Sequence, residues 1–213
     1  LITCIKKFHL IKDLAKERID HEFNKIITSE NVEFVKIMMK KNKLLNHIID
    51  GLQKLSTKDI GDLSKLPKNS LIRIAYITLK AKLKTENLKI YFKKSNKEIN
   101  LINKILFNEE LIISEMQAKK MKYYHGKEIS INNYILINTA NKKKQKKRIL
   151  NILNNWQPPI LPVSGADILS LKKVEKKNIG HILKMVEEWW VKEKFIPGKE
   201  DCLKKIKTQF LIP

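Results

Sequence analysis

The chain has 213 residues, of which 43% are hydrophobic, and its formal net charge is +22. This apolar content excludes a disordered chain and allows one sizeable core or two small ones. Lysines interrupt every apolar stretch before it reaches the ~18 residues that a membrane span requires. The opening residues also lack a signal-cleavage pattern, so we expect a cytoplasmic protein with no membrane partner.

The excess of basic residues predicts a polyanionic partner, because cations that neutralise phosphates release condensed counterions. Lys and Arg together number 44, against 22 Asp and Glu, yet only Arg18, Arg73 and Arg148 are arginines. Lysine supplies a point charge without the bidentate geometry of arginine, so we expect attraction to phosphate with little reading of bases. A merely solvated basic surface is the alternative.

Apolar residues recur at intervals of three and four along almost the whole chain, which predicts an all-α fold of many short helices. The expected helices cover residues 1–12, 16–28, 30–40, 43–54, 68–84, 96–106, 108–122, 130–141, 143–155, 165–171, 178–194 and 199–208. Among the start signals, "SNKE" at 95–98 has the form of a capping box. A turn is expected at Gly126, with Ser130 as the cap of the helix that follows it.

Three prolines close together predict an extended strap from Trp156 to Pro162, because each fixes φ and excludes a helix. The strap separates the preceding helices from a small helical C-terminal tail. In that tail, Trp189 and Trp190 are expected to pack in a core rather than to stack on bases.

No metal-binding or catalytic residue is predicted from the residues themselves. Cys4 and Cys202 lie at opposite ends of the chain without the spacing of a zinc site or of a disulfide framework. The acidic clusters "NEE" at 108–110 and "KED" at 199–201 lack a glycine-rich strand context, so we expect solvated helix residues there.

Four segments, in order, resemble the bacterial CCA-adding tRNA nucleotidyltransferases and their poly(A) polymerase relatives. These segments are "AKERIDHEFNKII" at 15–27, "FKKSNKE" at 92–98, "YYHGKEISINNYILINTA" at 123–140 and "PPILPVSGADIL" at 158–169. The resemblance covers residues 1 to about 205.

The resemblance implies a neck remnant at 1–28, an RNA-binding helical body at 29–155, and a proline strap with a helical tail at 156–213. The family's catalytic head, whose Asp-x-Asp pair holds two metal ions, has no counterpart in these residues. We therefore expect no catalytic residue, no cofactor and no nucleotide transfer from this chain alone, whereas the complete enzyme would use magnesium with CTP or ATP. The implied partners are tRNA and a separately encoded head.

The resemblance also implies structural roles for two small groups of residues. Its neck motif corresponds to Arg18, Glu22 and Lys25, where Arg18 and Glu22 stand one helical turn apart and are expected to pair. Its tail turn corresponds to Ser164, Gly165, Asp167 and Gly180, where Ser164 is expected to cap a helix and Asp167 to lie in its first turn.

The lysine-rich segments supply the RNA-binding candidates, and a solvated helix face is the alternative for each of them. The candidates are Lys119, Lys120, Lys122, Lys142, Lys143, Lys144, Lys146, Lys147 and Arg148. Two other functions stay open at this point: a stand-alone basic module that binds structured RNA, and a non-functional remnant of a split gene. The residues also leave CCA addition and poly(A) addition undistinguished.

Overall fold

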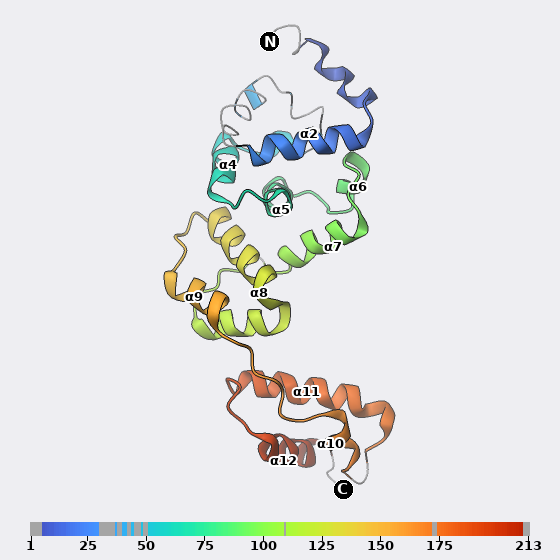
Figure 1. Cartoon of the computed structure of the whole chain (residues 1–213), viewed down its shortest axis with the longest axis vertical. Coiled ribbons are helices and arrows are strands. Elements are labelled where there is room, and N and C mark those ends of the chain that lie inside the picture. Colours follow the sequence, from blue (N-terminus) through green and yellow to red (C-terminus); the bar gives the residue numbers. More distant parts are fainter. Residues whose placement is uncertain are drawn as a thin grey trace.

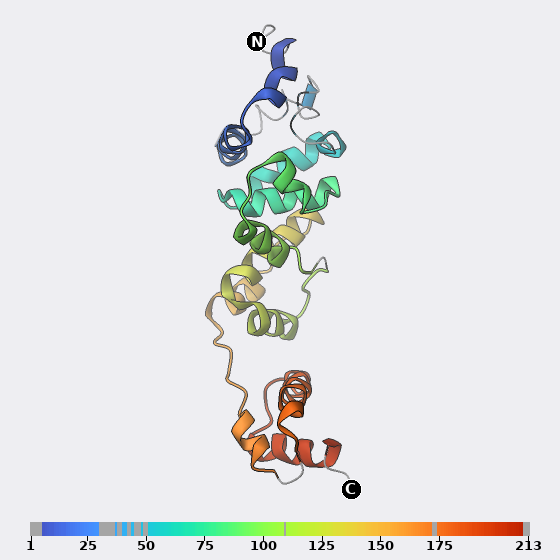
Figure 2. The ribbon, with the colours of Figure 1, turned by 90° about the vertical axis from the view of Figure 1, so that its right-hand side faces the viewer.

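The computed structural model describes residues 6–29, 37, 40–41, 44, 48, 51–108, 110–171 and 174–210. All regular structure in these ranges is helical and no strand occurs in them, which confirms the predicted all-α class. The expected helices at 30–40 and 43–54 fall mostly outside the described residues. None of the described helices is long and apolar enough to cross a membrane. The body helices and the tail follow one another along an elongated molecule (Figures 1 and 2).

The body is built around α5 (Ser70–Ala81), which packs against α2 (Lys16–Thr28), α7 (Asn96–Ile105) and α8 (Glu115–Ala140). Every residue from 72 to 78 is buried, because this helix is apolar on nearly all sides. The remaining elements of the body are η1 (Phe8–Asp13), η3 (Leu52–Lys54), α4 (Thr57–Asp62), η4 (Leu63–Lys65), α6 (Asn87–Tyr91) and α9 (Lys147–Asn155).

Capping boxes begin several of the helices, since a serine and an acceptor three residues later satisfy the free backbone N–H groups. The predicted box of Ser95 and Glu98 is present at α7. A box of Ser114 and Gln117 begins α8 at Glu115, so the prediction of a helix from residue 108 was wrong. Residues 110–114 are not helical.

The long helix α8 bends at Gly126, whose φ of 77° and ψ of 174° are open to glycine and strained for other residues. The turn predicted at this position is therefore present, as a kink between two helical halves of α8. Ser130 does not cap a helix: it is buried inside α8, and its hydroxyl has no hydrogen-bond partner. The predicted cap was wrong because the chain resumes helical geometry directly after the glycine.

The tail consists of α10 (Gly165–Leu169), η5 (Lys176–Asn178), α11 (Ile179–Lys192) and α12 (Lys199–Phe210). Its core includes Ile168, Val186 and Ile206, together with Trp190, which is 2% exposed as predicted. The indole Nε1 of Trp190 donates to the carbonyl of Pro197 at 2.9 Å. The segment between α9 and α10 is extended, as its prolines predict.

Candidate RNA-binding surface

Lysines from two distant parts of the sequence meet at one concave surface of the body. Lys58 of α4 and Lys65 of η4 face the loop between α8 and α9, and together they line a cavity of about 600 Å³. The remaining lining residues are Thr139, Lys142, Lys143, Lys144 and Gln145. Because α4 packs against α8, these lysines are held on a common support (Figure 1). We call this surface the lysine cavity.

Backbone hydrogen bonds at the end of α8 hold the loop that carries three of these lysines. Lys142 has a left-handed φ of 57°, and its N–H donates to the carbonyl of Thr139 at 3.1 Å. The N–H of Lys143 donates to the carbonyl of Asn138 at 2.9 Å, which completes a Schellman-type ending. Cations beside a helix C-terminus are also favoured by the helix dipole. The loop therefore presents its exposed ammonium groups from a defined backbone.

The sequence predicted three of the five cavity lysines and missed the other two. Lys143 and Lys144 were expected on a helix at 143–155, with Lys142 just before it, but α9 begins only at Lys147, so all three stand on a loop. Lys58 and Lys65 were missed because the short helix α4 was not predicted. The sequence feature that could have revealed α4 is the capping box of Ser56 with Asp59, which marks the start of this helix.

The rest of the lysine run lies beside the cavity. Lys146 and Lys147 are exposed at the start of α9, and the N–H of Lys146 donates to the hydroxyl of Tyr134 at 2.8 Å. Arg148 is also exposed, but it pairs with Glu115 at 2.7 Å, so its charge is partly neutralised.

The candidates at 119–122 lie at the other end of α8 and do not reach the lysine cavity (Figure 1). The amine of Lys119 stands 5.8 Å from the ring centre of Trp156, and Lys120 is exposed. Lys122 is only 4% exposed. Desolvation, with a smaller contribution from nearby Lys127, lowers the pKa of Lys122. The prediction of Lys122 as a surface contact to RNA was therefore wrong.

In the neck motif, Glu22 pairs with Lys25 at 3.1 Å and with His21 at 3.4 Å rather than with Arg18. The hydrogen bond from Lys25 lowers the pKa of Glu22. Arg18 and Glu22 instead stand at the edge of a mostly apolar cavity of about 420 Å³ between η1 and α2.

The tail turn is structural. Ser164 and Asp167 form the capping box of α10, and Asp167 also pairs with Lys199 of α12 at 2.5 Å. Gly165 and Gly180 both lie in helices without a positive φ. An added Cβ at Gly165 would lie 3.4 Å from the Cγ2 of Ile179, which is about van der Waals contact, and one at Gly180 would meet nothing within 4 Å, so packing requires glycine at neither position.

Comparison with known proteins relates the N-terminal part of the chain to an RNA-binding region. Residues 3–55 match the family model described as the probable RNA and SrmB-binding site of polymerase A, which covers about a quarter of the chain. No curated protein matches the chain. The matched segment precedes all of the predicted RNA contacts. Its described residues include seven exposed cations, Lys6, Lys7, Lys16, Arg18, Lys25, Lys41 and Lys54.

Proposed function

We propose that the chain is the tRNA-binding helical part of a tRNA nucleotidyltransferase that adds CCA to tRNA 3′ ends, with catalysis supplied by a head that these residues do not form. The observation that carries this proposal is the lysine cavity. The polymerase A match at 3–55 supports the same family and an RNA partner.

Phosphate is the ligand that the chemistry of the lysine cavity favours. Five lysines line it, and of these five only Lys65 forms an ion pair within the part of the chain that the structure describes, with Asp62 at 2.5 Å. Lysine attracts phosphate without distinguishing bases, so contacts here would fix the position of the RNA backbone. Because α4 and α8 hold the lysines at set positions, the folded shape of tRNA should match them better than a flexible strand does.

The test compares folded tRNA with an unstructured RNA of equal length at near-physiological salt. We expect tRNA to bind more tightly, with an affinity that falls steeply as salt rises. A variant with Lys58, Lys142, Lys143 and Lys144 changed to Gln should bind more weakly and show a shallower salt slope, by roughly 0.7 to 0.9 for each lost phosphate contact.

The matched control removes four charges elsewhere, by changing Lys97, Lys104, Lys184 and Lys192 to Gln. All four are exposed and lie outside the cavity, so this variant should retain most of the affinity and slope. Equal loss in both variants would contradict the lysine cavity as the binding site. Equal binding of tRNA and unstructured RNA would reduce the surface to general polycation attraction and remove support for a tRNA role.

A further inference from the structure

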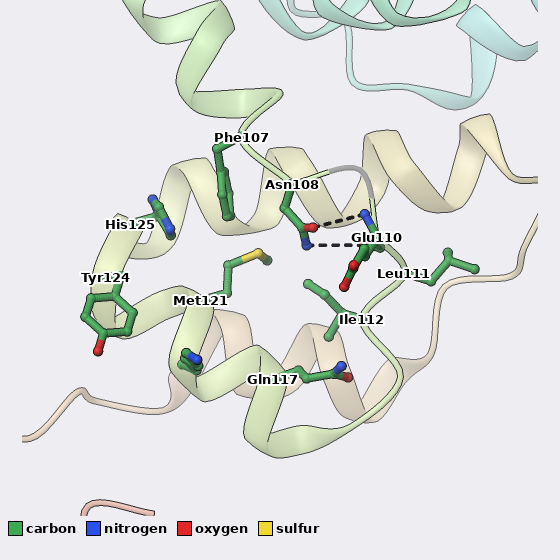
Figure 3. Close-up of a pocket in the computed structure, with 10 residues that line it drawn as sticks. Phe107, Asn108, Glu110, Leu111, Ile112, Gln117, Met121, Tyr124 and His125 are labelled. Atoms are coloured by element: carbon green, nitrogen blue, oxygen red, sulfur yellow. Dashed lines mark hydrogen bonds between the residues drawn. The ribbon is translucent and has the colours of Figure 1, made fainter. Parts of the chain in front are cut away.

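Another cavity, of about 290 Å³, lies between the α7–α8 connection and the first half of α8. Figure 3 shows Phe107 and His125 beside each other at one side, with Asn108 and Glu110 opposite and Met121 between them. The rings of Phe107 and His125 are stacked, with centroids 3.7 Å apart and planes inclined by 23°. His125 therefore covers one face of Phe107, which leaves only the other face for a flat ligand in the cavity that this ring lines.

The cavity combines this ring with an apolar base and a half-exposed opening. Met121 and Ile112 are 5% and 6% exposed, whereas Phe107 is 39% exposed. The bend at Gly126 directly follows His125 and ends the first half of α8 there. Aromatic faces of this kind bind nucleobases of any sequence, because every base has a π-face.

The charges around the cavity favour a neutral ligand over a phosphate. One cation, Lys120, is offset by one anion, Glu110. Protein atoms partly desolvate the imidazole, and this desolvation lowers the pKa of His125, so the ring is uncharged near pH 7. This balance contrasts with the five lysines of the lysine cavity.

Polar groups at the edge can orient a base. The Oε1 of Gln117 accepts from the N–H groups of Ile113 and Ser114 at 2.9 and 3.0 Å, which fixes the side-chain amide and leaves its Nε2 to donate. Asn108 is held in place by two hydrogen bonds with the backbone of Glu110. A flat ring with acceptor atoms on its edge fits both the apolar walls and this donor.

We propose that this cavity binds one unpaired nucleobase of the RNA, stacked on the free face of Phe107, an inference that rests on the RNA binding proposed above. The lysine cavity then holds phosphates at one end of α8. The cavity lined by Phe107, which we call the base cavity, holds a base near the other end. The base cavity should add affinity for unpaired nucleotides without adding to the salt slope.

The experiment measures the Kd of the chain for a single-stranded adenosine decamer and for an abasic ribose-phosphate decamer of equal charge. The wild-type chain should prefer the decamer with bases by roughly 5- to 100-fold, the range expected for one stacked base. Phe107→Ala and His125→Ala should each reduce this preference at an unchanged salt slope. Phe107→Tyr keeps the aromatic ring and should retain the preference for the decamer with bases. The control His181→Ala changes an exposed histidine of α11 and should leave this preference unchanged.

The outcomes separate this inference from the proposed function. If both decamers bind but Phe107→Ala and His125→Ala leave the base preference intact, the base cavity is excluded while RNA binding stands. If neither decamer nor tRNA binds, the proposed function fails as well. Tight binding of free AMP, lost in the same variants, would overturn the inference in favour of a mononucleotide site. His125 is exposed, so its variant remains informative even if Phe107→Ala does not fold.

Discussion

Arg73 is a buried cation of the body, at 2% exposure. Its guanidinium donates to the carbonyl of Ile27 at the end of α2, and to those of Leu66 and Pro67 at 2.9 Å each. This planar fork satisfies the carbonyl groups of two buried residues, Ile27 and Leu66, and that of exposed Pro67. A single arginine thereby ties α2 to the turn before α5.

Arg73→Lys should lower the free energy of unfolding by about 1–3 kcal/mol, because one ammonium group cannot reach all three carbonyls and leaves some of them unsatisfied. Urea denaturation followed by circular dichroism measures the change. The control is Arg148→Lys, an exposed substitution that can keep the ion pair with Glu115 and should change stability by less than about 0.5 kcal/mol. Similar losses in both variants would contradict this role of Arg73.

At the scale of residues, the sequence predicted capping boxes but did not predict which charged side chains are buried. The boxes of Ser95 with Glu98 and of Ser164 with Asp167 join residues three apart, so local spacing suffices to find them. The burial of Lys122 depends on packing around it in the folded chain, which its charged neighbours in sequence do not reveal. The buried role of Arg73 was missed for the same reason.

At the scale of elements, Trp156 links the body to the tail. It packs against the cluster that contains Ile149 and Leu153 of α9, and its ring centre lies 5.4 Å from that of Phe195 in the tail. Tyr123 adds a second link, because its hydroxyl donates to Glu187 of α11 at 2.7 Å. The strap beyond Trp156 is less protected, since Ile160 is 91% exposed.

Trp156→Ala should lower the melting temperature, by an amount that corresponds to about 1–3 kcal/mol, because a half-buried indole loses its contacts on both sides. Limited proteolysis should then cleave faster between residues 157 and 162. The control Ile160→Ala removes an exposed side chain of the same segment and should leave both measurements unchanged. An unaltered melt and cleavage pattern in Trp156→Ala would show that the strap is a free linker.

Three capping boxes depend on a carboxylate and should respond to acid. A hydrogen bond from Lys199, followed by those from Ser164, lowers the pKa of Asp167 to about 2. Burial raises the pKa of Asp59 and of Glu98, but hydrogen bonds from Ser56 and Ser95, together with Lys80 beside Asp59 and Lys94 beside Glu98, outweigh it, so both pKa values end below their usual values. A depressed carboxyl pKa contributes stability above about pH 4, and this contribution disappears as pH falls toward 2.

The melting temperature should therefore fall between about pH 4 and pH 2. The variant with Asp59→Asn, Glu98→Gln and Asp167→Asn should be less stable at pH 7 and show a smaller fall, because its amides do not titrate. The box of Ser114 with Gln117 has no titrating member and serves as the model for these amide boxes. Identical pH profiles for the two proteins would disprove a contribution from the caps.

Periodicity predicted the longer helices and the strap but not the short elements. α4 and α6 have six and five residues, too few to show a helical repeat, and tertiary contacts stabilise them. The lysine cavity could not be predicted in full for this reason, since two of its lysines stand on α4 and η4. The base cavity could not be predicted either, because Phe107 and His125 are distant in sequence and meet only when the first half of α8 packs beside the α7–α8 connection.

At the scale of the whole molecule, 44 basic residues against 22 acidic ones make charge repulsion a general cost of the folded state. The repulsion reaches furthest at low salt, where the Debye length is ~30 Å at 0.01 M, compared with ~8 Å at 0.15 M. Added salt should therefore stabilise the fold by screening repulsion among lysines. The same salt should weaken RNA binding, because each counterion released from a neutralised phosphate gains less entropy when the surrounding salt is more concentrated.

Stability and RNA affinity should consequently respond to salt in opposite directions. We expect the melting temperature of the free chain to rise as potassium chloride increases from 0.01 to 0.15 M, while the Kd for tRNA rises over the same range. The variant with Lys58, Lys142, Lys143 and Lys144 changed to Gln removes four neighbouring charges, so it should melt higher than the wild type at 0.01 M and approach it at 0.15 M. A melting temperature that falls with salt would mean that attractive ion pairs such as Lys199 with Asp167 outweigh the net repulsion. Measuring the melting temperature and the Kd for tRNA in one buffer series would then show whether the lysine charges act mainly on folding or on binding of the polyanionic partner.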